Sequence, residues 1–249
     1  MRLYLLALLF GACSLATHAR TIYVLSVGIC DYKSINDLRK TENDATDMAQ
    51  LFATHTSHVT TLLGAQATRE NILSRLQQLC SQAAEGDVLV FIFSGHGGKG
   101  GLCAYDTSSQ KTMITYTEIQ KVLQTCRANN KQLYIDACFS GGLREKKHQQ
   151  TATAQSSFSD MQGIMLFLSS RTDEKSQENP FGRNGFFTQY LLLGLKGAAD
   201  ADRNRIVTAK ELFDYVSHNV AQRTRNKQHP VMWGKFNDNM RLMNWNAAK

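Results

Sequence analysis

The chain of 249 residues lacks several features that would place it in a specialised class of protein. It has only 2 prolines, and it contains no internal repeat and no low-complexity tract. The formal net charge is +7, but the basic residues are dispersed and form no arginine-rich arm interleaved with aromatic residues. Nucleic-acid binding is therefore not indicated. The cysteines match no zinc-binding spacing, so a structural zinc site is not expected.

Long hydrophobic runs are also lacking, and the apolar run at residues 3–10 is too short to anchor the chain as a membrane-spanning helix. Arg2 precedes this run and the small-residue cleavage site at residues 17–19 follows it, a pattern that predicts a signal peptide over residues 1–19. We therefore expect an exported protein, secreted or periplasmic, without integral membrane association. The rival interpretation is a bacterial lipoprotein box that leaves Cys13 as a lipidated amino terminus.

The remaining residues, 20–249, are enough for one α/β domain with a substantial core. One of the 6 cysteines belongs to the signal peptide, and the others are Cys30, Cys80, Cys103, Cys126 and Cys138. An odd number in an exported chain leaves at least one thiol free. Cys30 and Cys126 flank predicted elements in a way that suggests burial. A disulfide among the cysteines other than Cys138 stays open.

Strand and helix patterns alternate along this domain. Apolar or β-rich runs predict strands at residues 22–29, 59–63, 87–93, 133–135 and 164–169. Apolar spacing and capping residues predict helices at residues 41–54, 68–83, 115–127, 185–196 and 208–223. The alternation favours an α/β fold with a doubly wound, mostly parallel central sheet flanked by helices on both faces. A flavodoxin-like binding domain would share this architecture, but the glycine-rich phosphate turn expected after its first strand is absent.

Three local patterns add detail to this architecture. Thr41 and Asn43 are capping candidates for the first helix, and Thr115 forms a capping box with Glu118. A hairpin is expected across residues 102–114. The closing segment, residues 227–236, contains a Gln-x-Pro pattern at residues 228–230. We expect it to be structural, with Val231 and Trp233 packed against the sheet.

Two of the predicted strands end in reactive residues. The run at 133–135 leads into Asp136 and Cys138, and the strand at 87–93 leads into His96 among glycines. The carboxyl ends of strands in open α/β sheets are where ligands bind, and a nucleophilic cysteine needs an acid or base nearby. If Cys138 stood alone, the structural interpretation would be favoured, in which it is a small apolar residue packed below a loop. The pairing with His96 favours a catalytic dyad.

The segments SGHG (94–97) and DACFSGG (136–142) resemble the His and Cys boxes of the caspase-like cysteine peptidases, peptidase family C14 of clan CD. They are more similar to the boxes of bacterial and metacaspase-type members than to those of animal caspases. The resemblance implies a caspase-haemoglobinase-like fold and an endopeptidase that requires no cofactor. In it, Cys138 attacks the scissile carbonyl, His96 protonates the leaving amine, and the N–H groups of Gly97 and Cys138 hold the oxyanion.

The resemblance also implies a preference for basic residues. In metacaspase-like proteins the residue matching Asp136 lines an acidic pocket for Arg or Lys before the cleaved bond, and Asp44 and Ser94 match its other members. A guanidinium fork suits paired carboxylates. Cleavage after Asp would need a basic pocket that these boxes lack. The rival interpretation of Asp44 is an acid in the first turn of a helix that complements the helix dipole.

A long polar segment, residues 143–160, falls where caspase-like chains carry the linker between a large-subunit-like part, here 20–142, and a small-subunit-like part, here 161–249. It offers the side chains that an acidic pocket would accept, namely Arg144, Lys146 and Lys147. Self-cleavage at these residues is one expectation, and an uncut surface loop is the other.

Residues 200–211, DADRNRIVTAKE, fit the calcium-loop pattern at several positions. The candidate ligands are Asp200, Asp202, Asn204, the carbonyl of Ile206, and Glu211. Arg205 stands where the pattern usually has glycine, a departure that costs on the order of 1 kcal/mol in a left-handed conformation. The alternatives are therefore a Ca2+ site and a turn that only caps the next helix.

Together these patterns predict an exported, monomeric, caspase-like cysteine endopeptidase that acts on polypeptides after Arg or Lys. One rival is a gingipain-type or clostripain-type peptidase of the same clan, which the small size and the absence of a long propeptide disfavour. The other is a catalytically silent binding or signalling scaffold that keeps both boxes as structure.

Overall fold

The structure, a computed structural model, describes residues 20–98, 100–138, 153–171, 174, 176–177, 179–180 and 182–245, and of Cys138 it describes the backbone alone. The expected signal peptide, the rival lipidation site at Cys13 and the cleavage candidates Arg144, Lys146 and Lys147 lie outside these residues. Within them, no helix combines the length and the apolar character needed to cross a membrane.

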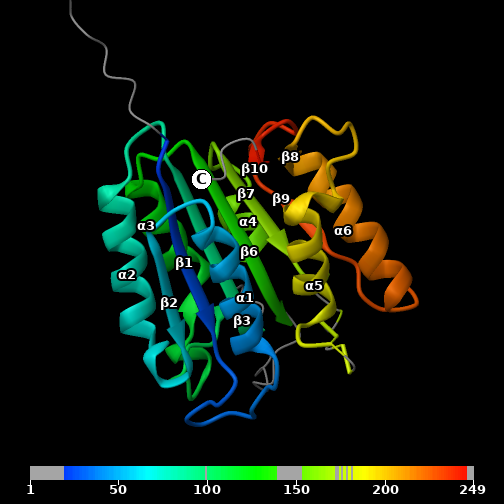
Figure 1. Cartoon of the computed structure of the whole chain (residues 1–249). Coiled ribbons are helices and arrows are strands. Elements are labelled where there is room, and N and C mark those ends of the chain that lie inside the picture. The colour runs from blue at the N-terminus through cyan, green and yellow to red at the C-terminus, as the bar shows by residue number, and fades with distance from the viewer. Residues whose placement is uncertain are drawn as a thin grey trace, which may run out of the picture.

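An 8-stranded sheet forms the centre of the molecule (Figure 1). Its main path runs in the order β2 (Val59–Leu63), β1 (Ile22–Gly28), β3 (Val88–Gly98), β6 (Asn130–Cys138), β7 (Ile164–Leu168) and β9 (Val231–Trp233). All neighbours on this path are parallel except β9, which pairs antiparallel with β7. The expected mostly parallel α/β sheet is confirmed.

Helices cover both faces of this sheet (Figure 1). The core on one face includes residues of α2 (Arg69–Gln82), α3 (Tyr116–Thr125) and α4 (Ala154–Phe158). The core on the other face includes residues of α1 (Thr41–Ala53), α5 (Phe186–Leu193) and α6 (Ala209–Arg223). Successive strand residues point to opposite faces, so Phe91 joins the first core and Ile92 the second. Burial on both faces explains why the strands are continuous apolar runs.

Shorter elements complete the fold. They are the helical turns η1 (Gly64–Gln66), η2 (Gln110–Thr112) and η3 (Gly194–Ala198), and the strands β4 (Gly101–Leu102), β5 (Ile114–Thr115), β8 (Ile206–Thr208) and β10 (Arg241–Asn244). β4 and β5 pair antiparallel, with Leu102 opposite Ile114, which confirms the expected hairpin. β8 and β10 form a separate two-stranded sheet.

The capping box of α3 is confirmed, whereas the expected caps of α1 are wrong. Thr115 Oγ1 accepts a hydrogen bond from the Glu118 N–H, and the Glu118 carboxylate accepts one from the Thr115 N–H. α1 follows Lys40 and has no side-chain cap. Thr41 donates instead to the carbonyl of Ile29, and Asn43 lies near Arg183, to whose carbonyl it donates. The side chains that local spacing assigns to capping therefore form hydrogen bonds to distant segments instead.

Two other elements differ from the expected ones. β3 does not end at Phe93 but continues to Gly98, because its pairing with β6 extends as far as His96. The helix expected to reach Lys196 ends as α5 at Leu193 and passes into a wider π turn. The segment expected to be loop around His96 is therefore strand.

The closing segment and the cysteines each correct one expectation. Val231 packs on the core, but Trp233, the last residue of the edge strand β9, is 37% exposed. The described cysteines, Cys30, Cys80, Cys103 and Cys126, are free thiols. Cys126 is buried as expected, whereas Cys30 is only partly buried.

Gly28, where β1 ends, allows α1 to approach the sheet closely. A Cβ at this position would lie 2.5 Å from the carbonyl oxygen of Thr41 and 2.7 Å from the Cβ of Ala45. We expect Gly28→Ala to lower the free energy of unfolding by about 1–3 kcal/mol, because the helix must move away. Urea unfolding measures this loss.

The matched control for that substitution is Gly86→Ala. Gly86 is exposed, and a Cβ there would meet nothing within 4 Å. We expect this variant to unfold within about 0.5 kcal/mol of the unmodified protein. Equal effects of the two substitutions would contradict the close packing of α1 on β1.

Candidate active site

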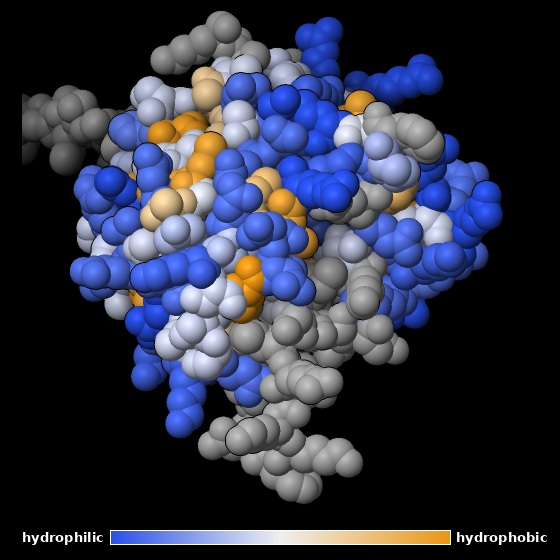
Figure 2. Space-filling view, turned by 90° about the horizontal axis from the view of Figure 1, so that it is seen from below, coloured by the Kyte–Doolittle hydropathy of each residue, from blue (hydrophilic) through white to orange (hydrophobic). Residues whose placement is uncertain are grey.

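The candidate catalytic residues lie at the carboxyl ends of two adjacent parallel strands. Cys138 is the last residue of β6, and in the register of the sheet it is the partner of His96 on β3. Neighbouring strands lie about 4.8 Å apart. The fold therefore brings the backbones of the two residues side by side, although 41 residues of chain separate them. Figure 2 views this end of the sheet, whose surface is largely hydrophilic with scattered apolar residues.

His96 is held by contacts from the loop after β1. Its Nε2 lies 2.8 Å from the carbonyl oxygen of Asn36, and because a carbonyl only accepts, Nε2 carries the proton. The backbone N–H of His96 donates to the Tyr32 hydroxyl over 2.7 Å, and the two rings lie 5.0 Å apart. The imidazole therefore has a defined tautomer, with Nδ1 as the acceptor when the ring is neutral.

Tyr32 also explains the glycine before His96. A Cβ on Gly95 would lie 2.6 Å from the Tyr32 hydroxyl oxygen. Burial raises the pKa of Tyr32 above its usual range, so this hydroxyl stays protonated near neutrality. Tyr32 was not among the candidates from the sequence, since nothing in its local pattern distinguishes it from other loop aromatics.

The three residues expected to form an acidic pocket come together. Asp136 lies on β6, Asp44 lies in the first turn of α1, and both are buried. A Cβ on Gly185 would lie 3.2 Å from Oδ2 of Asp136 and 3.5 Å from Oδ2 of Asp44, so the two carboxylates converge on one point. Ser94, the register partner of Asp136 on β3, donates to Asp44 over 2.9 Å.

The start of α5 holds this acid pair. The N–H of Gly185, the residue that caps α5, donates to Oδ1 of Asp44 over 3.1 Å. Thr188 Oγ1 donates to Oδ2 of Asp136 over 3.1 Å, and the Ser176 hydroxyl donates to Oδ1. Asp44 thus faces the positive amino end of α5 rather than serving only its own helix. No local sequence signal marks Gly185, Thr188 or Ser176, because their role depends on contacts with distant segments.

Both carboxylates are destabilised as anions. Burial raises the pKa of Asp44 to about 7, and the adjacent charge of Asp136 adds to the rise. Burial also raises the pKa of Asp136, against the lowering effect of hydrogen bonds from hydroxyls that include Ser176 and Thr188. Among the residues that the structure describes, no lysine or arginine forms an ion pair with either acid. A cationic group that entered this site would relieve the repulsion.

The candidate oxyanion donors lie beside the reactive pair. Gly97 follows His96 on β3 and pairs with Leu102 of β4, and Cys138 ends β6. The N–H of Cys103 donates to the His96 carbonyl over 2.9 Å, which keeps the β3 extension in place. The role of the Gly97 and Cys138 N–H groups in holding an oxyanion stays a prediction.

The candidate calcium loop has features of a Ca2+ site and features of a turn that caps the next helix. One ligand oxygen from each of Asp200, Asp202 and Glu211 lies within 4.8 Å of the others, as a metal site requires. Arg205 has a φ of 66°, the left-handed conformation expected at this position. However, Asp200 already accepts from the Asn204 and Arg205 N–H groups.

The remaining ligand candidates have hydrogen-bonding roles too. Glu211 completes a capping box with Thr208 at the start of α6, which accounts for its position without a metal. The side chain of Asn204 accepts from the Ile206 N–H over 2.7 Å. The residues therefore fit a calcium ion in part, and the metal stays a prediction.

Comparisons with known proteins give the family of the chain and agree with its fold. The family model of the caspase domain, peptidase C14, matches residues 22–240. A crystal structure of a protein from Geobacter sulfurreducens is similar in fold, with a TM-score of 0.66 and 19% sequence identity over 87% of this chain and 94% of that chain. No curated protein matches the sequence.

The acid pair makes stability depend on pH. The pKa of Asp44 is about 7 in the folded protein, above its unfolded value, so the folded state binds more protons between these two pKa values. The contribution of this group is full below its unfolded value of 3.8 and is lost as the pH rises from there through about 7. We expect Asp44→Asn to remove about 1–3 kcal/mol of the stability difference between pH 5 and pH 8.

Urea unfolding of both proteins at pH 5 and pH 8 measures this effect. The matched control is Asp214→Asn, because Asp214 is an exposed acid on α6 that pairs with Lys210. We expect this control to keep the pH dependence of the unmodified protein. Equal pH dependence in all three proteins would contradict the raised pKa of Asp44.

Proposed function

Because the chain belongs to the caspase-domain family of cysteine peptidases, we propose that it is an endopeptidase that hydrolyses polypeptides after arginine or lysine by a Cys138–His96 dyad. The observation that carries the specificity is the pair of buried carboxylates, Asp44 and Asp136, which converge beside Gly185. The register of β3 and β6 supports the dyad.

The reaction follows from the roles of these residues. The Cys138 thiol passes its proton to His96 as its sulfur bonds to the scissile carbonyl carbon, and the bond from that carbon to the leaving nitrogen breaks as His96 gives this proton to the amine. Water then attacks the thioester and gives a proton to His96, the carbon–sulfur bond breaks, and His96 returns the proton to the sulfur, which restores the thiol. The N–H groups of Gly97 and Cys138 would stabilise the oxyanion in both steps.

The fixed position of His96 supports this mechanism. Asn36 accepts from Nε2 and so plays the part of the third, orienting group that catalytic bases usually have. The carboxylates of Asp44 and Asp136 do not orient the imidazole, because they accept hydrogen bonds from residues at the start of α5. We therefore assign them to the substrate and not to the dyad.

A basic side chain of the substrate matches the charge of the acid pair. The guanidinium of arginine offers a planar fork of donors that meets carboxylates bidentately, and lysine offers a point charge. Either cation would lower the raised pKa values of Asp44 and Asp136 by balancing their charge. An aspartate side chain would add a third negative charge to the site.

Several further features belong to the same proposal. They are export after removal of residues 1–19, self-cleavage at Arg144, Lys146 or Lys147, a monomeric state, and modulation by Ca2+ through the loop from Asp200 to Glu211. The caspase-domain match favours this family over the gingipain-type and clostripain-type rivals. The silent scaffold is the rival that an activity measurement separates.

The first test is hydrolysis of fluorogenic peptides that end in Arg, Lys or Asp, by the unmodified protein and by Cys138→Ala, with Ca2+ and with a chelator. We expect turnover of the Arg and Lys peptides that Cys138→Ala abolishes. A lower rate in the chelator would support a role for calcium. Folded protein that cleaves no peptide in any condition would support the scaffold.

The second test removes one charge from the acid pair. We expect Asp136→Asn to lower kcat/KM for the Arg peptide about 100-fold, because a buried charge pair with the substrate is lost. The control Asp214→Asn should match the unmodified protein. Undiminished cleavage by Asp136→Asn would contradict the proposed pocket.

The acid pair also predicts a pH dependence of activity. In the unmodified protein, kcat/KM should rise from pH 6 to pH 8 as Asp44 ionises.

A further inference from the structure

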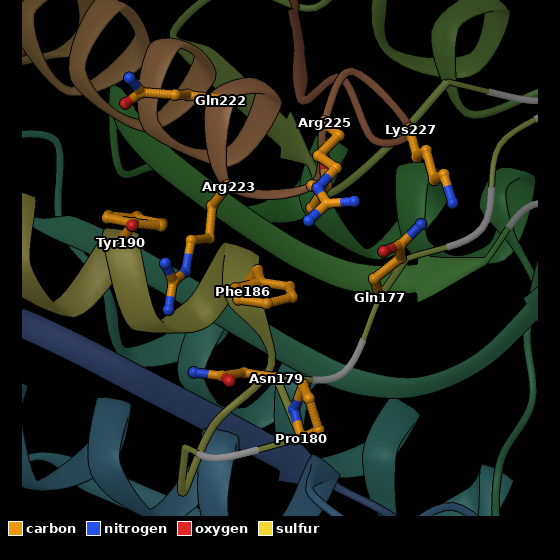
Figure 3. Close-up of a pocket in the computed structure, with 10 residues that line it drawn as sticks. Gln177, Asn179, Pro180, Phe186, Tyr190, Gln222, Arg223, Arg225 and Lys227 are labelled. Carbon is orange, nitrogen blue, oxygen red and sulfur yellow. The ribbon is translucent and has the colours of Figure 1, made fainter.

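A cavity close to the acid pair is lined by side chains of the opposite charge (Figure 3). Its volume is about 740 Å³, and its walls come from Gln177, Asn179 and Pro180, from the first turns of α5, and from the end of α6 with the turn that follows. Arg223, Arg225 and Lys227 line it, and Figure 3 shows Arg223 extending toward Phe186 from the end of α6 and Arg225 extending from the turn that follows.

The charge of this basic cavity, defined by Arg223, Arg225 and Lys227, is not balanced within the described part of the chain. None of the three forms an ion pair there, and no described acidic residue lines the cavity. All three side chains are exposed. Cations gathered around one hollow raise the local concentration of anions.

The backbone of the turn that carries these cations is fixed. Arg225 and Asn226 have φ values of 54° and 57°, left-handed conformations of the kind that commonly follow the end of a helix. Hydrogen bonds hold the turn in place: Thr224 accepts from the Gln228 N–H over 3.1 Å, and Gln228 accepts from the Gln177 N–H over 2.8 Å. The cations therefore lie on a turn with a defined position beside the segment that holds Gln177.

The basic cavity and the acid pair share their walls. Ser176 donates to Asp136 while its neighbour Gln177 lines the basic cavity. Gly185 donates to Asp44 while its neighbour Phe186 lines the cavity, and the Phe186 N–H donates to the Gln177 carbonyl over 3.2 Å. In each segment, therefore, one residue contacts the acid pair and the next residue lines the basic cavity.

We propose that the basic cavity binds an acidic side chain of the polypeptide substrate, a few residues away from the arginine or lysine held by the acid pair. This inference rests on the proposed peptidase function and names a narrower substrate class, sequences that carry a basic and an acidic residue close together. The rings of Phe186 and Tyr190 supply apolar walls for the aliphatic part of a glutamate.

The test compares peptides that contain one Arg and are otherwise neutral with peptides in which Glu replaces one residue at successive positions around that Arg. The cavity variant combines Arg223→Gln, Arg225→Gln and Lys227→Gln. The control variant combines Lys111→Gln, Lys121→Gln and Arg127→Gln, which make the same charge change at exposed positions outside the cavity.

We expect Glu at one or more positions to raise kcat/KM about tenfold in the unmodified protein and in the control variant. The cavity variant should show no gain from Glu and should cleave the neutral peptide normally. High salt should reduce the gain. The proposal is overturned if Glu gives no gain at any position, or if the gain persists in the cavity variant.

A charge reversal tests the same site without depending on the triple variant being folded. We expect the double variant Arg223→Glu, Lys227→Glu to prefer Lys over Glu at the position where the unmodified protein prefers Glu. An unchanged preference for Glu in this variant would overturn the proposal. Circular dichroism confirms the fold of each variant.

A binding measurement separates failure of the inference from failure of the proposed function. If the neutral Arg peptide is not cleaved, the proposed function fails, and anisotropy of a labelled Glu-containing peptide without Arg or Lys is measured on Cys138→Ala. We expect binding that weakens about tenfold when the cavity substitutions are added. The cavity proposal is overturned by undetectable binding or by equal binding to both proteins.

Discussion

The register between β3 and β6 is the constraint on which the whole site depends. One parallel alignment pairs His96 with Cys138 and, two residues earlier, Ser94 with Asp136. Because side chains alternate along a strand, a shift by one residue would turn each of these positions to the opposite face of the sheet. Large apolar residues that precede them, such as Phe91 opposite Leu133, are buried in the core and make that shift costly. The core therefore sets the position of the polar residues beyond it.

The acid pair shows how the fold supports groups that burial disfavours. Asp44 and Asp136 lie together out of solvent, and the start of α5 offsets part of that cost through the Gly185 N–H and the Thr188 hydroxyl. The compensation is incomplete, since burial still raises the pKa of both carboxyl groups. Because the cost of burying the two carboxylates is only partly offset in the absence of substrate, the site is suited to bind a cationic group.

Opposite charges lie close together at this end of the molecule because the segment between β7 and α5 has two sides. Ser176 and Gly185 face the acids, and Gln177 and Phe186 face the cavity lined by Arg223 and its neighbours. Recognition of two charged groups of opposite sign would give more selectivity than either site alone, because a substrate lacking one of them leaves a charge unbalanced.

The sequence by itself determined the five parallel strands of the central sheet, most helices, the capping box of α3, and the placement of Cys138 and His96 at strand ends, because these follow from periodicity and from residues adjacent in the chain. It also pointed, through a family resemblance, to Asp44 beside Asp136. Only the tertiary structure decided which groups hold them. Tyr32 at His96, Gly185 at the acids, and the loss of Thr41 as a helix cap each depend on contacts between segments far apart in the chain. Local patterns record the propensity of a segment, whereas a hydrogen bond between distant segments exists only once the core has aligned them.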